Sequence, residues 1–397
     1  MTSVSPRRRA EAALSLAAAA DAIAVTYLLA ITAAAATARR RQVVDLDPPR
    51  LRVVVLVPAH DEQTALPATL RSLAALDYPP QLLRIVVIAD NCTDATANLA
   101  RDHGVEVLER HGDPRGKGAA LAWALARLAQ SDADHDAVLF VDADCAASPN
   151  LVLALERRLW RGAGAAQASY VVANPAESWS SALRFAGFAL INTVRPAGKD
   201  ALRLSSGILG SGFAVSRDVL ERVGWNAFSL TEDTEFHLRL LEAGIRVHFA
   251  QEASVSSSMP TSLSASRTQH ARWESGKLEM MAHWAPRLFL EGVRRRDARL
   301  LHAALEGLVP PQSALAASGL AFTIAGATLR SRRVTALAAG GLAGQVVHVL
   351  VGLWLVRAPA VVYRALVFAP VLVGWKLALY LRVAFQRAPK RWERTAR

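Results

Sequence analysis

The strongest constraint on this chain is a long apolar run near its start. Residues 12–36 are nearly all Ala, Leu, Ile and Val, and Asp21 is the one charged residue among them. About 20 such residues cross the hydrocarbon core of a bilayer. The run is too long for the apolar region of a typical signal peptide, and an Arg cluster follows it. The sequence therefore predicts an uncleaved transmembrane helix.

The composition of the whole chain agrees with a protein that lies partly in lipid. Hydrophobic residues make up 52% of the chain and the mean hydropathy is +0.21, which is too apolar for an ordinary soluble protein. The formal net charge is +12. Its Arg residues cluster beside apolar runs and form no aromatic-interleaved patch, which favours membrane lipids over nucleic acid as partners. Cys92 and Cys145 have no disulfide or metal-ligand spacing, which favours a reducing compartment.

The C-terminal part contains further apolar segments. Residues 287–302 combine Leu and Phe with a dense set of Arg residues, as in a helix lying flat among headgroups. The runs 307–329 and 334–356 are each long enough to span a bilayer. The last run, 359–385, contains Arg364 and Lys376, so an interfacial or re-entrant helix competes with a third crossing there.

The Arg distribution also predicts an orientation in the cell membrane. More Arg residues follow the first apolar run, between 39 and 52, than precede it, so the positive-inside rule places the next domain in the cytosol. A hairpin over 307–356 with an interfacial 359–385 then keeps the basic tail, 387–397, in the cytosol. The Arg residues at 330–333 would face outward, against the same rule. The sequence thus predicts a multi-pass protein and leaves its C-terminal topology open.

The pattern changes between residues 51 and 284, where short β-branched runs alternate with amphipathic stretches. This alternation predicts an α/β domain with a mainly parallel sheet and helices on both faces, in which ligands bind at the carboxyl ends of the strands. The predicted strands are 51–57, 84–89 and 137–141, and the predicted helices are 62–76, 94–102 and 116–130. The chain divides into an N-terminal segment 1–44, the α/β domain 45–286, an amphipathic helix 287–302 and a membrane region 303–397.

Polar loops follow the first two predicted strands. Glu62 follows the first strand, and Asp90 closes the second and should point at the ligand crevice. Asp94 could serve simply as a helix cap. The loop 113–118 places Lys117 and two glycines at a helix start, where free N–H groups favour a phosphate, although a solvated turn fits equally well.

The motif Asp142-Ala143-Asp144 comes directly after the strand 137–141. Two carboxylates separated by one residue on a loop can hold Mg²⁺ or Mn²⁺ through oxygen ligands while a diphosphate fills the remaining positions. An acidic turn is the alternative. The apolar strand directly before the pair favours the metal.

Two motifs follow further along the chain. Thr231-Glu232-Asp233 precedes a predicted helix, and a capping role would account for Thr231 alone. In Gln269-His270-Ala271-Arg272-Trp273, the amide, the guanidinium and the indole share one helix face. Arg binds phosphate through a bidentate fork, and an aromatic face suits a sugar ring. In isolation, the pentapeptide would indicate an amphipathic helix with an aromatic anchor.

In this order, the motifs resemble the membrane-integrated family 2 glycosyltransferases of the cellulose-synthase-like and hyaluronan-synthase-like kind. The resemblance covers about residues 51–284 and the membrane helices around them. It implies a GT-A-like domain, a nucleotide-sugar donor such as a UDP-sugar, and a saccharide or lipid acceptor. Asn91 departs from the pattern, because many relatives have a second acidic residue after the one that matches Asp90.

The resemblance also implies a role for each motif. Asp144, with Asp142 beside it, would bind the metal, and Asp233 would be the general base. The donor would contact Glu62 and Asp90 at the uridine, and Gln269 and Arg272 at the diphosphate. The acceptor would contact Trp273 and the loop of Gly210 and Ser211. Asp142, beside the metal, and Lys117, from the phosphate-binding loop described above, complete the predicted donor site.

These roles imply an inverting displacement. Asp233 would take the proton from an acceptor hydroxyl while the hydroxyl attacks the anomeric carbon opposite the departing nucleoside diphosphate. The resemblance places this reaction in polysaccharide synthesis. Two alternatives remain: a single transfer to a lipid, and a non-catalytic membrane subunit that keeps the nucleotide-binding fold. The presence of both Asp144 and Asp233 argues against the second alternative.

Overall fold

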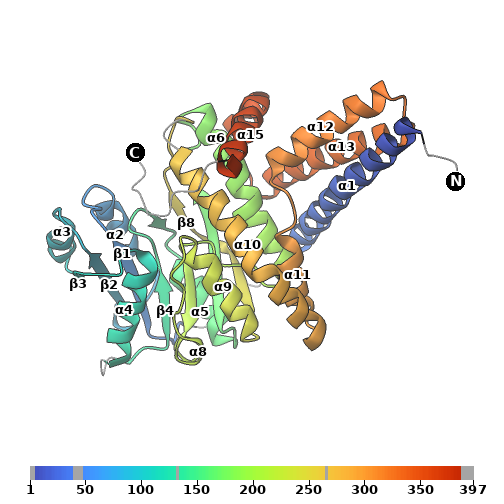
Figure 1. The fold of residues 1–397 in the computed structure, drawn as a ribbon. Helices are drawn as coiled ribbons and strands as arrows, with labels where there is room; N and C mark the ends of the chain where they lie inside the picture. Colours follow the sequence, from blue (N-terminus) through green and yellow to red (C-terminus); the bar gives the residue numbers. More distant parts are fainter. Residues whose placement is uncertain (1–4, 39–47, 131–133, 264–266, 386–397) are drawn as a thin grey trace.

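The structure is a computed structural model, and it describes residues 5–38, 48–130, 134–263 and 267–385. An α/β domain forms one part of the molecule. Helices α1 (Pro6–Ala38), α12 (Gln312–Thr328) and α13 (Arg332–Leu355) pack side by side and extend away from it (Figure 1). We call these three helices the apolar bundle. The N-terminus of the chain lies at the end of the bundle that is far from the domain (Figure 1).

The α/β domain is built on one eight-stranded sheet in the order β3-β2-β1-β4-β7-β6-β8-β5. The first four strands of this order are parallel, and β6 is parallel to β8. β7 runs antiparallel to both of its neighbours, and β5 runs antiparallel to β8. The strands are β1 (Val53–Ala59), β2 (Leu83–Asp90), β3 (Glu106–Arg110), β4 (Ala137–Phe140), β5 (Ala146–Ala147), β6 (Ala165–Val172), β7 (Phe213–Ser216) and β8 (Val247–Ser257). The predicted fold class, α/β with a mostly parallel sheet, is confirmed.

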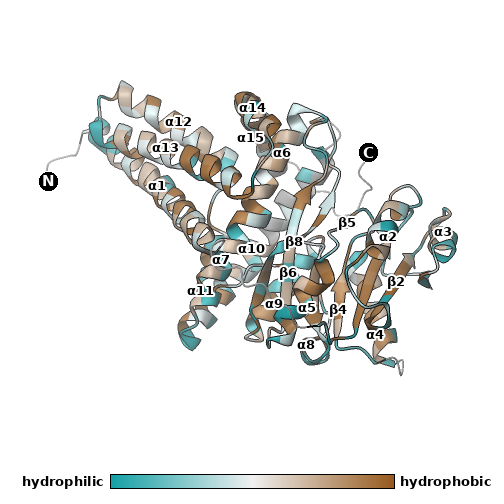
Figure 2. Ribbon diagram, turned by 180° about the vertical axis from the view of Figure 1, so that it is seen from behind, coloured by the Kyte–Doolittle hydropathy of each residue, from teal (hydrophilic) through white to brown (hydrophobic). Residues whose placement is uncertain are grey.

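Side-chain alternation along β1 explains why both faces of the sheet are covered. Val53, Val55 and Val57 enter one buried cluster with helices α2 (Leu66–Ala74) and α5 (Leu151–Trp160). Val54 and Leu56 enter a second cluster, with α4 (Lys117–Gln130), α8 (Arg217–Val223) and α9 (Glu232–Glu242). Successive residues of a strand face opposite sides, so a continuous Val and Leu run fits a strand buried on both faces. Figure 2 shows this hydrophobic colouring along the central strands.

Two of the three predicted helices of the domain begin later than expected. The helix predicted at 62–76 is α2, which starts at Leu66 with Pro67 in its first turn. The helix predicted at 94–102 is α3 (Thr96–Asp102). In both cases the preceding residues form a polar turn, because Asp61 has a positive φ of 53° and its side chain binds the backbone before α3. The helix predicted at 116–130 agrees with α4 within one residue.

The apolar run predicted at residues 12–36 lies within helix α1 of the apolar bundle. Three helices among the described residues are long and apolar enough to cross a membrane, namely Arg7–Thr37, Arg332–Leu355 and Ala360–Arg382. Asp21, the charged residue of the first, accepts a hydrogen bond of 2.5 Å from Ser318 Oγ of α12. The carboxylate therefore faces a neighbouring helix, as polar groups within membrane bundles do.

The C-terminal helices differ in bounds from the sequence prediction. The run 307–329 contains a helix of 17 residues, α12, because Pro310 and Pro311 prevent an earlier start. The run 359–385 is broken into α14 (Ala360–Ala365), a 3-10 turn at Leu366–Phe368 and α15 (Ala369–Phe385). The break lies just before Pro370, which has no backbone N–H to donate to the preceding turn and so interrupts the α-helical hydrogen bonds.

A separate amphipathic helix at 287–302 is not formed, so this prediction was wrong. Helix α10 (Arg267–Arg295) runs through Pro286, and α11 (Ala298–Glu306) follows it. The chain turns at Arg296, which has a positive φ of 53°, and the Asp297 side chain caps α11 by accepting from the Arg299 backbone.

The apolar bundle joins the domain through a tightly packed contact. After α6 (Trp179–Ala189), the chain forms a π-helical segment, η3 (Leu190–Val194), and then α7 (Arg195–Ala201). A Cβ on Gly198 of α7 would lie 2.1 Å from the Ile31 carbonyl oxygen of α1, and one on Gly352 of α13 would lie 2.3 Å from a methyl of Leu190. These close approaches require glycine and fix the bundle against the wall of the domain.

Candidate active site

A single cleft of about 2440 Å³ lies at the carboxyl ends of β1, β2 and β4 and continues toward the apolar helices. Its position is the one expected for a ligand site in an open α/β sheet. The structure brings most of the predicted site residues together here. Those that line the cleft are Glu62, Asp90, Lys117, Asp142, Asp144, Gly210 and Asp233.

Lys117 lies at the centre of the polar part of the cleft. Its ammonium is 2.6 Å from Asp142 Oδ1 and 3.3 Å from Glu232 Oε1, and it donates a hydrogen bond of 2.7 Å to the Gly210 carbonyl. Burial alone would lower the pKa of Lys117, but Asp142 and Glu232 outweigh it and raise that pKa above its usual range. A permanent cation therefore connects the metal motif, the glycine-serine loop and the start of α9.

The loop of Gly210 and Ser211 supports the acidic residues directly. The backbone N–H of Asp142 donates to Ser211 Oγ over 3.0 Å. Gly210 has a positive φ of 89°, and a Cβ at this position would lie 3.3 Å from Asp233 Oδ2. The loop thus supports the metal motif through Ser211 and passes close to the predicted base at Gly210.

Asp233 lies in the first turn of α9, which begins at Glu232. Its Oδ1 accepts a hydrogen bond of 2.7 Å from the Thr234 backbone. The cap expected at Thr231 is not formed, because no side-chain bond caps the helix there. Burial, followed by the charge of Glu232, raises the pKa of Asp233 to about 7. A carboxylate in this environment can exchange a proton near neutral pH.

Asp90 has a partner that the sequence analysis missed. Arg110 ends β3 in register with Asp90, and its guanidinium donates to Asp90 Oδ1 over 2.5 Å and to the Pro114 carbonyl over 2.6 Å. Asn91 donates to the Gly112 carbonyl and accepts from the Gly112 backbone. Asn91, the departure from the family pattern, therefore ties the Asp90 loop to the loop before Lys117. The strand and its arginine were missed because three of the five residues of β3 are charged, which is not typical of a buried strand.

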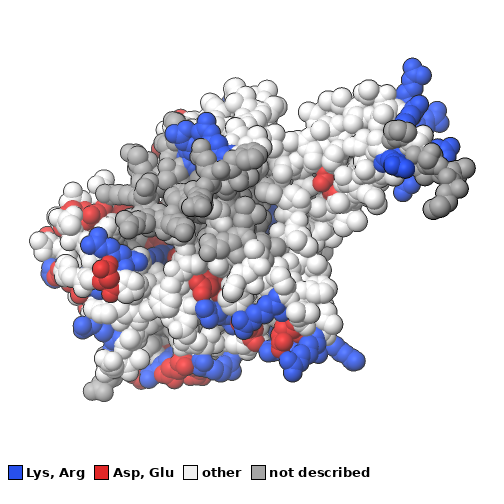
Figure 3. Space-filling view, viewed as in Figure 1, with Lys and Arg blue, Asp and Glu red and all other residues white. Residues whose placement is uncertain are grey.

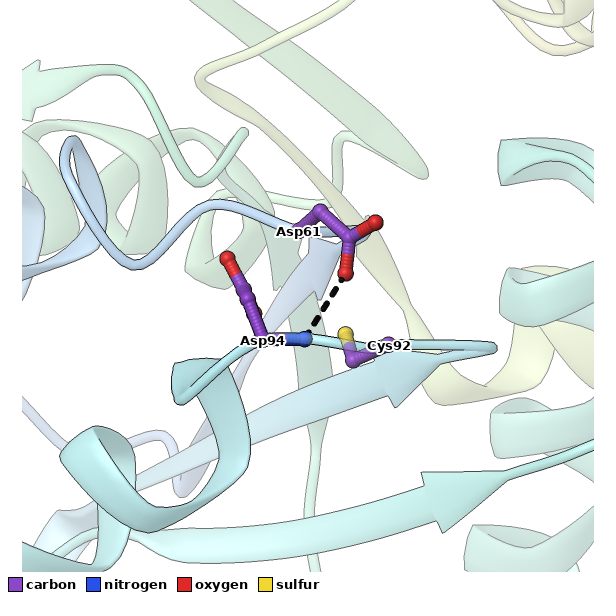
Figure 4. A group of neighbouring side chains, drawn as sticks. All are labelled: Asp61, Cys92 and Asp94. Carbon is purple, nitrogen blue, oxygen red and sulfur yellow. Dashed lines mark hydrogen bonds between the residues drawn. The ribbon is translucent and has the colours of Figure 1, made fainter.

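Figure 4 shows a separate group of neighbouring side chains, formed by Asp61, Cys92 and Asp94. Asp61 Oδ1 accepts hydrogen bonds from the backbones of Thr93 and Asp94, at 2.6 and 3.2 Å. The bond from Thr93 contributes most to lowering the pKa of Asp61. Asp94 in turn accepts from the Thr96 backbone at the start of α3. These carboxylates hold two loops together, and Asp94 bonds the first residue of α3 from the position before its cap residue, Ala95.

The motif of residues 269–273 lies in the first turns of α10. The side chains of Gln269, Arg272 and Trp273 lie outside the described part of the chain, so their predicted roles stay predictions. His270 is described: its Nδ1 is 3.0 Å from the Lys376 ammonium of α15, and its ring meets Trp375 edge to face. Lys376, one of the two charged residues that argued against a membrane crossing at 359–385, thus lines the cleft.

The residues of the metal motif fit a divalent cation. Asp142 and Asp144 have carboxylate oxygens within 4.8 Å of each other and of Cys145 Sγ. Carboxylate oxygens are the ligands that Mg²⁺ and Mn²⁺ favour. Cys145 is buried, which raises the pKa of its thiol to about 12, so it stays protonated and contributes no thiolate. The acidic group can therefore hold a metal ion through Asp142 and Asp144.

Comparison with known proteins gives a consistent assignment. A family model described as "Glycosyltransferase like family 2" matches residues 48–276, more than half of the chain. The chain belongs to this family. A probable glycosyltransferase of Bacillus subtilis (strain 168), YdaM, is 26% identical over 250 residues, which cover 60% of this chain and 58% of the relative. The chain therefore spans just over half the length of that curated relative.

A solved structure has the same fold as this family 2 glycosyltransferase. It is the mannosyltransferase PcManGT from Pyrobaculum calidifontis in complex with GDP-Man and Mn²⁺, with a TM-score of 0.57 and 20% identity. The match covers 93% of this chain and 99% of that chain, so it extends over the apolar helices as well as the sheet. The GT-A-like architecture predicted from the motifs is confirmed.

Proposed function

We propose that this family 2 glycosyltransferase transfers a sugar from a nucleoside-diphosphate donor to an acceptor hydroxyl, with inversion at the anomeric carbon. One observation carries the proposal. Asp233, a carboxylate with a pKa near 7, lies in one cleft with the pair Asp142 and Asp144, and Lys117 connects the two groups. The site thus combines a base with a place for a departing diphosphate.

The donor would bind along the carboxyl ends of β1, β2 and β4. Asp90, oriented by Arg110, and Glu62 would contact the nucleoside, which the family resemblance gives as uridine. Lys117, Gln269 and Arg272 would bind the diphosphate, since cations stabilise the charge that develops on it. A divalent cation held by Asp144 and Asp142 would supply further neutralisation of that charge.

Asp233 would accept the acceptor's proton. A general base works best when its pKa lies near the operating pH. Burial and Glu232 give Asp233 such a pKa. The loop of Gly210 and Ser211, with Trp273, would form the acceptor side of the site. Gly210 lies so close to Asp233 that a side chain there would touch the base, so the loop borders the place where the acceptor hydroxyl would bind.

The acceptor would be a saccharide or a lipid presented at the membrane, as in the cellulose-synthase-like and hyaluronan-synthase-like relatives. The cleft supports this proposal because it extends from Asp233 to Leu372 and Tyr380 of α15. We further propose that the catalytic domain, residues 45–286, faces the cytosol, where nucleotide sugars are made.

A donor panel tests the proposed function. Purified full-length protein in detergent is incubated with UDP- and GDP-sugars and Mn²⁺ or Mg²⁺, and release of nucleoside diphosphate is measured with and without EDTA. We expect metal-dependent release from one donor, with the opposite anomeric configuration in the product. Retention of configuration would refute the single displacement.

A further inference from the structure

The cleft continues well beyond the residues that the proposed reaction uses. One wall is the continuous helical segment α6-η3-α7, whose residues Arg184, Phe188, Ile191 and Arg195 recur at about one-turn spacing and all line the cleft. The middle of this face, formed by Phe188 and Ile191, is apolar, and Ile191 is 47% exposed. An apolar wall with an arginine near each end fits an amphiphilic ligand better than a free sugar.

Arg195 lies within electrostatic reach of Glu306, a carboxylate that it shares with Lys199. No ion pair or hydrogen bond of its guanidinium joins it to the described part of the chain, and its Nε is buried without a partner. The carboxylate in this region, Glu306, is engaged by Lys199, with contacts of 2.9 and 3.1 Å from the Lys199 ammonium. Two cations thus share one carboxylate at this wall, and the partly exposed Arg195 guanidinium leaves positive charge in the cleft that a ligand anion would balance.

Two amides line the same side of the cleft. Gln312, at the start of α12, accepts hydrogen bonds from Gln345 through its carbonyl and Oε1, at 2.7 and 3.0 Å, while its Nε2 is buried without a partner in the described structure. Asn192 of η3 lies one turn before Arg195. π-Helical segments are concentrated at functional sites. Two donor side chains without described partners thus face this part of the cleft.

The position of Arg195 relative to α1 and α13 indicates which kind of anion would bind it. Around Arg195, α7 meets α1 at Gly198 and η3 meets α13 at Gly352, close to the ends of both membrane helices. Side chains at that level lie among lipid headgroups, where phosphates are abundant. Arg195 therefore lies where the phosphate of a membrane lipid would be found.

We propose that Arg195, with Gln312 and Asn192, forms a subsite for the phosphate group of a lipid-borne acceptor. The inference rests on the proposed transferase function and specifies its acceptor. The lipid chain would lie along Phe188 and Ile191 and pass toward α15. The acceptor hydroxyl would reach Asp233, which lies one helical turn from His237, another residue of the cleft wall.

Binding of a defined lipid phosphate tests the subsite. Full-length protein in detergent is titrated with farnesyl phosphate, with farnesol and with inorganic phosphate, and intrinsic tryptophan fluorescence is followed. We expect saturable binding of farnesyl phosphate and much weaker binding of the other two. Arg195→Gln should weaken farnesyl phosphate binding about tenfold or more, the loss expected for one charge-assisted contact. Arg222→Gln, at an exposed site on α8, is the matched control and should bind as the parent does.

Each other result has a defined meaning. Unchanged binding by Arg195→Gln, or inorganic phosphate that binds as tightly and competes, would overturn the lipid-phosphate subsite. Binding of a nucleotide sugar with Mn²⁺ is measured on the same samples. Donor binding without farnesyl phosphate binding would overturn this inference and leave the transferase proposal intact, whereas absence of all donor binding would overturn the proposed function itself.

Discussion

At the scale of single residues, the site is governed by the excess of negative charge around Lys117. Asp142, Glu232 and Asp233 all lie within its electrostatic reach, and Asp142 and Glu232 contact it directly. One ammonium cannot neutralise three carboxylates in a partly buried cleft. Burial of Asp233, followed by the charge of Glu232, raises its pKa to about 7, so it keeps a proton up to about neutral pH.

The raised pKa of Asp233 predicts a pH dependence of stability. The folded state holds this proton up to about pH 7, whereas an unfolded Asp loses it near pH 4. The free energy of unfolding should therefore fall between about pH 4 and pH 7 as the pH rises. Asp233→Asn should remove that part of the fall, so the variant gains Tm relative to the parent at pH 8 more than at pH 5. Asp218→Asn, at an exposed position, should follow the parent at both pH values.

The same Asp233→Asn variant separates catalysis from binding. If Asp233 is the base, turnover should fall by about 10²- to 10⁴-fold while donor affinity, measured by calorimetry, stays near normal. Near-normal turnover would leave Asp233 a structural residue and make Glu232, which lies beside it and contacts Lys117, the next candidate.

Asp144→Asn should abolish turnover and weaken donor binding in a metal-dependent way. Asp144 belongs to the acidic group, and the family resemblance gives it as the metal ligand, whereas Asp142 is paired with Lys117. Donor titrations with Mn²⁺ and with EDTA should differ for the parent and converge for the variant. Full activity of the variant in metal-depleted buffer would contradict the metal assignment.

At the scale of helices and strands, the elements that could be predicted are those with a clear pattern in their own residues. The Val and Ile runs of β1, β2 and β4 were predictable because both faces of these strands are buried. β7 was missed because its four residues follow a glycine-rich loop, and it is fixed by tertiary contacts such as the stacking of Phe213 on Phe140 at 4.5 Å. Likewise, no local pattern connects Arg110 with Asp90, since only the pairing of β2 with β3 brings them together.

The contact between α7 and α1 gives a prediction about stability. In Gly198→Ala, the added methyl would lie 2.1 Å from a backbone oxygen of α1, so the two helices must separate. Overpacking of this kind costs about 1–3 kcal/mol, and Tm in detergent should fall. Gly187→Ala in α6 is the matched control, because its methyl would meet nothing within 4 Å. An unchanged Tm for both variants would show that α1 and α7 do not pack as described.

At the scale of the whole molecule, the apolar bundle separates two charged regions. Figure 3 shows a largely uncharged bundle surface between the charged α/β domain and basic side chains at the far end. Arg7 of α1 donates to the Leu329 carbonyl at the end of α12, so the Arg residues near 7–9 and 330–333 lie at that same end. With 33 residues, α1 is about 50 Å long and extends past a hydrocarbon core of about 30 Å to reach the domain.

This arrangement allows the orientation to be tested with single cysteines. Two variants are made in a background that lacks Cys92 and Cys145: Gln130→Cys at the exposed end of α4, and Thr328→Cys at the far end of the bundle. If the domain is cytosolic and the bundle spans the membrane, an impermeant maleimide should label Thr328→Cys in intact cells and Gln130→Cys only after permeabilisation. The Arg residues at the far end of the bundle favour the opposite orientation under the positive-inside rule. The labelling pattern therefore decides between the two orientations. Labelling of Gln130→Cys alone in intact cells would place the domain outside, and equal protection of both sites would mean that the bundle does not span the membrane.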